Sequence, residues 1–222
     1  MSVDQKFRQL LSKTLIALTL GAALIIVCYF FIDRPVAAWV HQDNFPRERV
    51  FAWLTYPPPI LQAWAPVALV ALMIRRAWGR LHRWERTCLA ACVALVLADQ
   101  FKETLAYMFG RYWPDTWIDN NPSFIRSGAY GFHPFHAGTA FGSFPSGHTA
   151  RTVALASVVW IAYPRWKVVC ILASAAVAVS LVGMDYHFAG DVIAGGLVGG
   201  IVGTYTAYGG GLLEQSPENT NH

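Results

Sequence analysis

The chain has 222 residues, of which 55% are hydrophobic and only 14% are charged, and its mean hydropathy is +0.37. Because soluble domains carry roughly 25% charged residues, this composition excludes an ordinary soluble domain. Four uncharged runs approach or exceed the roughly 20 apolar residues that a membrane-crossing helix needs, which indicates a multi-pass membrane protein. These runs are residues 14–32, 50–74, 168–184 and 192–213.

The first predicted span covers residues 13–32 and follows the basic residues Lys6, Arg8 and Lys13. A basic segment before an apolar run is also typical of a signal peptide. However, the 19 uncharged residues of this run exceed an h-region of about 7–15, and no small-x-small cleavage site follows. We therefore expect a retained membrane anchor.

Five further spans follow, the first of them behind a run of three prolines that suits a helix start but not a helix interior. They are residues 59–75, 86–109, 147–163, 167–184 and 190–209. The sequence thus predicts an all-α bundle of six transmembrane helices, forming one membrane-embedded domain over residues 1–213. The polar segment 214–222 is predicted to be a disordered tail.

The distribution of lysine and arginine predicts the orientation of this bundle. Ten basic residues fall on the side that holds the N-terminus, the second loop and the fourth loop, against five on the opposite side. The positive-inside rule therefore places both termini in the cytoplasm. The net charge of +4 reflects these loops and the lipid headgroups beside them, and we do not expect nucleic acid as a partner. The protein is expected in the cell (inner) membrane.

The third span carries Asp99, Lys102 and Glu103 inside an otherwise apolar helix. Charges at that depth are costly, so they indicate either a functional site or an ion pair that joins helices. An internal pair between Asp99 and Lys102 is the structural alternative.

The fourth span begins with Pro145-Ser146-Gly147-His148 at its outer end. A helix start leaves free backbone N–H groups and a positive dipole end, which together suit a phosphate. His148 lies in the first turn, beside any group bound there. By itself such a tetrapeptide is also compatible with a simple helix cap.

The sixth span begins with "DYHFAGD", which places His187 and Asp191 four residues apart on one helix face. A carboxylate at that spacing can hold one imidazole tautomer and leave the other nitrogen free to attack. Together with His148, this pair predicts a metal-independent phosphoryl-transfer site with no cofactor. His187 would attack phosphorus, and His148 would protonate the leaving oxygen and later activate water.

The PSGH tetrapeptide followed by His187-x-x-x-Asp191 resembles the type-2 phosphatidic acid phosphatase superfamily, over about residues 95–205. That resemblance implies six-span lipid phosphatases related to vanadium haloperoxidases. It implies His187 as nucleophile, Asp191 as its orienting partner and His148 as acid and base. Ser146 and Gly147 are implied as phosphate binders.

Two features depart from the family pattern. Lys102 and Arg111 are nine residues apart, where the family has a lysine, six residues and Arg-Pro. Leu181, which follows Ser180, replaces the arginine of the third motif. We expect Lys102 and Arg111 to bind phosphate. Arg151, one turn after His148, is a further candidate clamp, with an ion pair to Asp99 or Glu103 as its structural alternative.

The loop over residues 120–136 has no motif role. Its Arg126, His133 and His136 are candidates for substrate contact.

Taken together, these patterns and the resemblance predict a lipid phosphate or diphosphate phosphatase that acts at the outer (periplasmic) leaflet through a phosphohistidine. A phosphotransferase of the same fold and a non-catalytic lipid-binding or transport relative remain alternatives. A metal site is not expected, since no ligand spacing supports zinc. The sequence names neither the lipid nor the oligomeric state.

Overall fold

The computed structural model describes residues 3–42, 49–117 and 119–212, and across these residues the chain is helical with no β-strand. Only isolated bridges within the outer loops, such as the one between Arg111 and Phe132, have extended pairing. The predicted all-α class is therefore confirmed. The predicted polar tail, residues 214–222, lies outside the described residues.

The helices follow one another along the chain with short connections, except for the long segment between α5 and α7. Their bounds are α1 (Val3–Val27), the π-helical turn η1 (Cys28–Ile32), α2 (Asp33–Gln42), α3 (Arg49–Thr55), α4 (Pro57–Ala77), α5 (Arg83–Phe109), α6 (Phe124–Ser127), the 3₁₀ turn η2 (Thr139–Phe141), α7 (Gly147–Ala162), the 3₁₀ turn η3 (Pro164–Trp166), α8 (Lys167–Gly183) and α9 (Ala189–Gly209). From the second span onward, the predicted ends agree with α4, α5, α7, α8 and α9 to within three residues.

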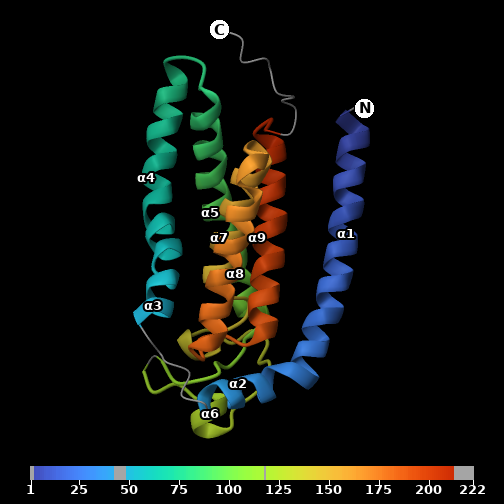
Figure 1. Ribbon diagram of the computed structural model, residues 1–222, viewed down its shortest axis with the longest axis vertical. Coiled ribbons are helices and arrows are strands. Elements are labelled where there is room, and N and C mark those ends of the chain that lie inside the picture. Colours follow the sequence, from blue (N-terminus) through green and yellow to red (C-terminus); the bar gives the residue numbers. More distant parts are fainter. Residues whose placement is uncertain (1–2, 43–48, 118, 213–222) are drawn as a thin grey trace.

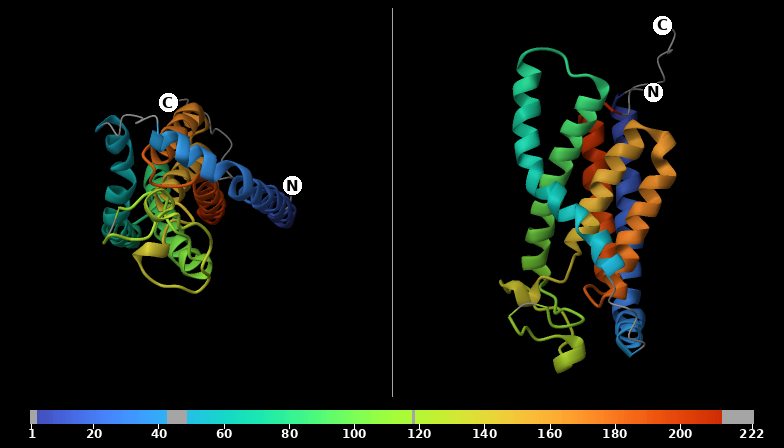
Figure 2. Two further views of the ribbon diagram at one scale, coloured as in Figure 1. Left: turned by 90° about the horizontal axis from the view of Figure 1, so that it is seen from below. Right: turned by 60° about the vertical axis from the view of Figure 1, so that its left-hand side comes forward.

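The long helices run side by side, and α1 lies at the edge of the bundle (Figure 1). The start of α1, the connection between α4 and α5, and the end of α9 share one end of the bundle. The loop between α5 and α7 gathers at the other end together with α2 and α6 (Figures 1 and 2). We call these the basic end and the loop end.

Among the described residues, four stretches are long and apolar enough to cross a membrane, which supports a multi-pass membrane protein. They are Gln5–Gln42, Phe51–Ala77, Pro164–Gly183 and Ala189–Gly209. The other two long helices, α5 and α7, are not among these stretches. Helix α7 has only 16 residues, and α5 carries ionisable residues near both ends. The complete six-span topology therefore stays a prediction.

The contact between α7 and α9 sets the geometry of the loop end. Gly195, Gly199 and Gly203 recur every fourth residue of α9, and a Cβ at any of them would collide with a backbone carbonyl of α7. Small residues at this spacing let membrane helices pack with their backbones almost in contact. The two N-terminal ends are joined directly, because the amide of Ser146 donates to the carbonyl of Asp191 at 3.0 Å. The His148 and His187 segments are thereby brought together.

Small residues also bring α5 close to α7. Ala94 and Ala98 of α5 are fully buried in a cluster with Ala154 and Val158 of α7. The next turn of α5 carries Asp99 and Lys102, so this packing places two ionisable residues beside the start of α7.

The first span does not end at Ile32, as the sequence analysis expected. The π-helical turn at Cys28–Ile32 passes directly into α2, which extends the helical segment to Gln42 and crosses the loop end (Figure 2). Single π-helical turns inside α-helices recur at functional sites. Here the turn places Asp33 and His41, two residues of α2, over the loops of that end.

Candidate active site

The two histidines predicted from the sequence lie opposite each other at the loop end. His148 is in the first turn of α7, and His187 immediately precedes α9. Their ring centroids are 6.5 Å apart, and the ring planes are inclined to each other by 63°. The indole of Trp113 lies against His187, with ring centroids 5.2 Å apart. His187 is 4% exposed, so its orientation is set by the surrounding protein.

Asp191 lies behind His187 and is fully buried. It occupies the first turn of α9, where its Oδ2 accepts from the backbone N–H of Phe188 at 3.1 Å. The hydroxyl of Ser143 donates to the same oxygen at 2.6 Å. The Nδ1 of His187 is 3.7 Å from this Oδ2, longer than a hydrogen bond. The carboxylate of Asp191 therefore faces the Nδ1 of His187, and Nε2 is the ring nitrogen left for an attack on phosphorus.

Arg111 holds the other oxygen of the same carboxylate. Its Nη1 donates to Oδ1 of Asp191 at 2.5 Å, and its Nη2 donates to Oδ2 of Asp33 at 2.7 Å. Burial by itself lowers the pKa of Arg111, but the charges of Asp191 and Asp33 outweigh it and raise the pKa above its ordinary value. The structure thus gives Arg111 two protein carboxylates as partners in place of the expected substrate phosphate.

Asp33 completes a buried chain of charges that begins on the first membrane segment. It is 1% exposed, and its Oδ1 accepts from the backbone N–H of Gly190 at 2.9 Å. Through Arg111, it is linked to Asp191 and then to His187. Sequence analysis missed this residue, although a lone aspartate directly after an apolar span is a signal that could have been used.

Aromatic rings enclose the guanidinium of Arg111. Its carbon Cζ lies 4.4 Å from the ring centroid of Phe188 and 5.0 Å from that of Phe132, with Tyr29 and Tyr130 at 5.5 and 5.4 Å. Tyr130 accepts from Nη2 of Arg111 at 3.1 Å and donates to the carbonyl of Tyr29 at 2.6 Å. Burial raises the pKa of Tyr130, which keeps this phenol protonated as a donor.

The start of α7 keeps the free amides that the sequence predicted. Ser146 is buried at the N-cap, and its hydroxyl accepts from the backbone N–H of Thr149 at 3.4 Å and from the Thr149 hydroxyl at 3.1 Å. Within the part of the chain that is described, the N–H groups of Gly147 and His148 have no acceptor. These two amides at the positive end of a helix dipole can bind an anion.

Two basic side chains lie over this helix start. An added Cβ on Gly147 would be 3.4 Å from Nη1 of Arg151 and 3.5 Å from the side-chain carbons of Lys102. Arg151 also pairs with Asp99 through Nε at 3.0 Å and through Nη2, which is the structural alternative considered for it. Lys102 pairs with Glu103 at 2.9 Å and Asp99 pairs with Arg151, so the pair between Asp99 and Lys102, the structural alternative, does not form.

A cavity of about 510 Å³ opens beside these basic side chains, between the end of α5 and the loop that precedes α7. Its lining includes Lys102, Trp113 and His136, together with Phe141 and Tyr107. The cavity thus brings together Lys102, which is predicted to bind phosphate, the Trp113 ring that lies against His187, and His136, a predicted substrate contact. His136 is exposed, and its Nδ1 is 3.0 Å from the carbonyl of Pro134.

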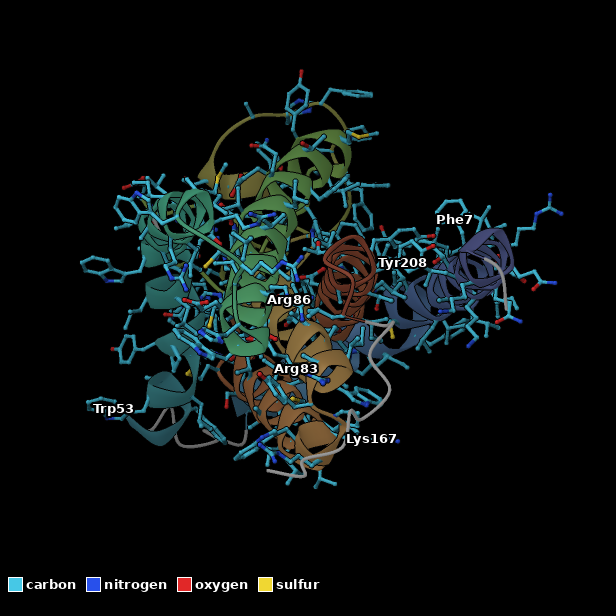
Figure 3. The ribbon with its side chains drawn as sticks, turned by 90° about the horizontal axis from the view of Figure 1, so that it is seen from above. Phe7, Trp53, Arg83, Arg86, Lys167 and Tyr208 are labelled. Carbon is cyan, nitrogen blue, oxygen red and sulfur yellow. The ribbon has the colours of Figure 1, made fainter. Side chains whose placement is uncertain are left out.

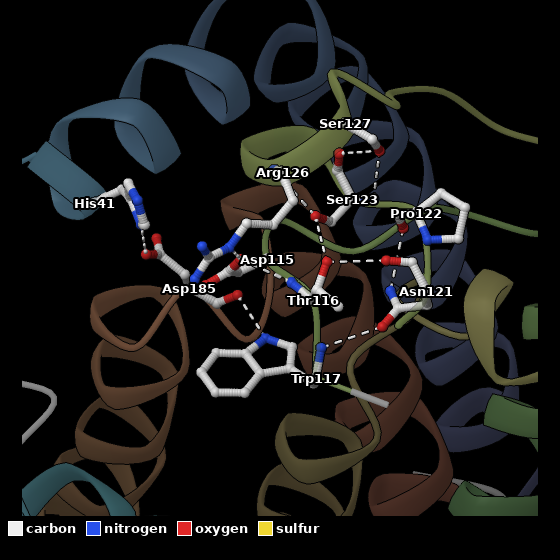
Figure 4. Close-up of polar contacts among 10 residues, drawn as sticks. All are labelled: His41, Asp115, Thr116, Trp117, Asn121, Pro122, Ser123, Arg126, Ser127 and Asp185. Carbon is white, nitrogen blue, oxygen red and sulfur yellow. Dashed lines mark hydrogen bonds and ion pairs between the residues drawn. The ribbon is translucent and has the colours of Figure 1, made fainter. Parts of the chain in front are cut away.

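The other two predicted contact residues serve the loops. His133 packs on Tyr112 with ring centroids 4.5 Å apart, and its amide donates to the carbonyl of Gly110 at 2.5 Å. Gly110 is needed there because it adopts a φ of 52° and an added Cβ would strike that same residue, His133. Arg126 donates through Nε to Oδ1 of Asp115 at 3.0 Å (Figure 4).

Asp115 belongs to a polar cluster that ties α2, the long loop and the turn before His187 together (Figure 4). His41 Nδ1 is 3.3 Å from Oδ2 of Asp185, and the indole N–H of Trp117 donates to the carbonyl of Asp185 at 3.1 Å. His41, Asp115 and Asp185 could also hold a cation, with ligand atoms within 4.8 Å of one another, but Arg126 already supplies positive charge to Asp115. The cluster fixes the turn two residues before His187.

Leu181 replaces a basic residue without leaving a polar group behind. Its side chain is fully buried, and its carbonyl accepts from the amides of Tyr186 at 3.0 Å and His187 at 3.3 Å. The backbone at this position therefore shapes the turn that carries His187, whereas its side chain contributes packing.

Comparison with known proteins supports the resemblance found in the sequence. A sequence model of the PAP2 superfamily matches residues 87–211, more than half of the chain. Lipid A 1-phosphatases from Rhizobium etli and Rhizobium johnstonii are similar at 31% identity over 113 residues and 30% over 148 residues. These matches cover 51% and 65% of this chain, but only 46% and 56% of the relatives.

A solved structure extends the likeness to the fold. The PAP2-type phosphatidylglycerolphosphate phosphatase of Bacillus subtilis matches with a TM-score of 0.51 and 18% identity, over 90% of this chain and 94% of the other. At that identity the match supports the fold alone. Taken with the superfamily match across α5 to α9, where both histidines and Asp191 lie, it shows that this chain belongs to the PAP2 superfamily.

Proposed function

We propose that this protein is an integral-membrane phosphatase that hydrolyses lipid phosphates or diphosphates. The observation that carries the proposal is the pair of facing rings, His148 and His187, at 6.5 Å beside a helix start with free amides. The relatives named above are phosphatases of phosphorylated lipids, and the apolar bundle gives a lipid substrate direct access from the bilayer.

In the first step, His187 attacks the phosphorus through Nε2 while Asp191 faces its Nδ1–H. A bond from Nε2 to phosphorus forms as the bond from phosphorus to the leaving oxygen breaks. His148, in its protonated form, donates a proton to that oxygen, so the lipid leaves as a neutral alcohol or as a shortened phosphate. Asp191 stabilises the positive charge that develops on the His187 ring.

In the second step, water replaces the protein as the bond partner of phosphorus. His148, now neutral, removes a proton from water, whose oxygen attacks phosphorus. The bond between phosphorus and His187 breaks, inorganic phosphate leaves, and both histidines return to their starting protonation states. This scheme requires no metal ion, because backbone amides and basic side chains stabilise the negative charge on the phosphoryl oxygens.

Those partners are the amides of Gly147 and His148 together with the side chains of Lys102 and Arg151. Preorganised donors at such positions stabilise the transition state because they need no reorientation during the reaction. Arg111 and Asp33 are assigned a positioning role, since they hold Asp191 and are themselves buried away from solvent. The cavity beside Lys102 and His136 is proposed to hold the phosphorylated headgroup.

The proposed site faces the periplasm, as the excess of basic residues at the other end of the bundle suggests. A cysteine introduced at Pro122 or at Gly128, two exposed positions at the loop end, should react with an impermeant thiol reagent on cells with a permeabilised outer membrane. A control cysteine at Trp78, at the basic end, should react only after the inner membrane is lysed. The reverse pattern would invert the proposed topology.

The decisive experiment is phosphoenzyme trapping with purified protein in EDTA, using a panel of lipid A, phosphatidic acid, phosphatidylglycerol phosphate and undecaprenyl diphosphate. Wild type should form an acid-labile phosphoenzyme and release inorganic phosphate. His187→Ala should do neither, whereas His82→Ala, an exposed control at the basic end of the bundle, should still form the intermediate. Turnover by His187→Ala, or activity that requires one added metal ion, would refute the mechanism. Transfer to an added alcohol without phosphate release would identify a phosphotransferase.

A further inference from the structure

A cavity lies at the basic end of the bundle, away from both histidines. Its volume is about 900 Å³, and it is bounded by the connection between α4 and α5, the first turns of α5 and the last turns of α9. The arginine mouth of this cavity is remote from the candidate active site, since Arg86 and Lys102 lie 16 residues apart on α5, about 24 Å at 1.5 Å per residue. It cannot belong to the catalytic machinery.

The mouth of this cavity is positively charged. Arg76, Arg80 and Arg86 line it. The acidic residue of this segment, Glu85, is buried and already paired with Nε of Arg75 at 3.1 Å and with the amide of His82 at 2.7 Å. In the described part of the molecule, Arg76 and Arg80 are exposed and make no ion pair. Arg76 and Arg80 therefore give the mouth positive charge that no carboxylate of the described residues pairs.

The floor of the cavity is apolar and runs along the membrane axis. Leu89, Val93 and Leu97 follow one another at intervals of four residues on one face of α5, and all three line the cavity. They cover about 12 Å of helix length, starting about one turn from Arg86. Tyr205 and Thr206 of α9 form the facing wall. The result is a groove with a cationic mouth at the membrane surface and an apolar floor that descends into the bilayer.

We propose that this groove binds an anionic phospholipid of the leaflet opposite the active site. The headgroup phosphate would contact Arg76 and Arg80, and an acyl chain would lie along Leu89, Val93 and Leu97. Free phosphate would leave the apolar floor uncovered, whereas a zwitterionic lipid would leave the arginine charge uncompensated. Basic pockets between membrane helices on the side of excess positive charge favour anionic headgroups in this way. The inference does not depend on the proposed phosphatase activity.

A second groove at the same end offers a matched control. It lies on the other side of α9, against α1, and Lys6 and Lys13 line it. Figure 3 views this end: Arg86 lies toward α5, whereas Phe7 and Tyr208 lie between α1 and α9. Removing two charges from either groove changes the net charge of the same membrane face equally. The second groove, however, has lysines in place of arginines, and its apolar residues Leu10, Trp160 and Ile161 come from two helices rather than from one helix face.

The test measures binding of phosphatidylglycerol and of phosphatidylcholine with the same acyl chains to the purified full chain, by native mass spectrometry and thermal stability. Phosphatidylglycerol is a phosphodiester and has no terminal phosphate to be hydrolysed. Wild type should retain phosphatidylglycerol in preference to phosphatidylcholine. Arg76→Gln with Arg80→Gln should weaken that binding ~20-fold, because each arginine near a membrane surface contributes about a factor of five.

Lys6→Gln with Lys13→Gln should leave binding within about twofold of wild type, as should His187→Ala, which separates this site from the catalytic one. Equal losses in the arginine and lysine variants would show a non-specific charge effect and overturn the proposal. Equal retention of the two lipids by wild type would also overturn it. If phosphatidylglycerol binds only after residues 213–222 are removed, the groove belongs to the chain's own C-terminal segment and the proposal fails.

Discussion

Arg111 and Arg151 both lie beside the candidate active site and both bind aspartate, but their surroundings differ. Arg111 is fully buried between two carboxylates and four aromatic rings. Arg151 keeps 16% of its side chain exposed, binds the single carboxylate of Asp99, and directs Nη1 to the start of α7. A guanidinium has five N–H donors, so one carboxylate does not exhaust it. The same residue type thus serves the scaffold in one place and remains available to an anion in the other.

Arg111→Met should have the largest effect. It would leave Asp33 and Asp191 buried without their cation, and breaking a buried ion pair typically costs about 3–5 kcal/mol. We expect a large fall in the melting temperature in detergent and complete loss of phosphate release. Arg34→Met is the matched control, since Arg34 is exposed and also lies over Tyr130, at 5.3 Å. Equal effects of the two substitutions would contradict the scaffold role.

Asp191→Asn should remove most activity while disturbing the fold less. Loss of the carboxylate that faces His187 favours the wrong imidazole tautomer, and in other catalytic triads that change costs up to about 10⁴-fold in rate. The measurement is kcat for phosphate release, with the melting temperature showing that the variant is folded. A folded variant that retains more than a tenth of the wild-type rate would remove Asp191 from its orienting role.

Asp33→Asn should have an intermediate effect that acts through Arg111. The amide retains an acceptor for the N–H of Gly190 but removes one of the two charges that hold the guanidinium. We expect kcat to fall about 10–100-fold, as for other remote substitutions that shift a catalytic group, with KM little changed. A raised KM with normal kcat would mean that Asp33 does not position the catalytic carboxylate.

Arg151→Leu tests the other arginine. If Nη1 contacts the phosphoryl group, the rate should fall about 10²-fold or more, as when one preorganised donor is removed, and vanadate inhibition should weaken. The fold should change little, because a partly exposed ion pair contributes only about 0–1 kcal/mol.

Asp99→Asn gives the smallest effect and completes the comparison. It breaks the same ion pair but leaves Arg151 in place, so activity should stay within about fivefold of wild type, because a partly exposed pair contributes only about 0–1 kcal/mol. If the two substitutions lower the rate equally, the ion pair itself is what matters, and Arg151 is a structural residue.

Much of the architecture could be read from local sequence patterns. Apolar runs, prolines at helix starts and basic loops predicted the helices, because each pattern acts over a few neighbouring residues. The small-residue repeat at Gly195, Gly199 and Gly203 was an available signal for the α7 contact that the sequence analysis did not use. The continuation of α1 through a π-helical turn into α2 had no such signal.

The residues of the candidate site also fall into those that local sequence patterns predicted and those that they did not. His148, His187 and Asp191 were predicted because their chemistry and spacing are local, and the structure brings them together. Asp33, Ser143 and Trp113 were missed, because each acts on a residue far away in the chain. Arg126 was predicted as a substrate contact, yet its Nε binds Asp115, a partner that only the folded loop supplies.

The sequence by itself determined that this is an all-helical membrane protein with two histidines and an aspartate at helix starts, since hydropathy and helix-end chemistry depend on adjacent residues. Only the tertiary structure decided which cation meets which anion. A buried charge takes the partner that packing brings within hydrogen-bond distance, whatever the separation along the chain. Arg111 therefore lies between Asp33 and Asp191, 78 and 80 residues away, while Arg151 lies beside Asp99 at the helix start that is proposed to bind phosphate.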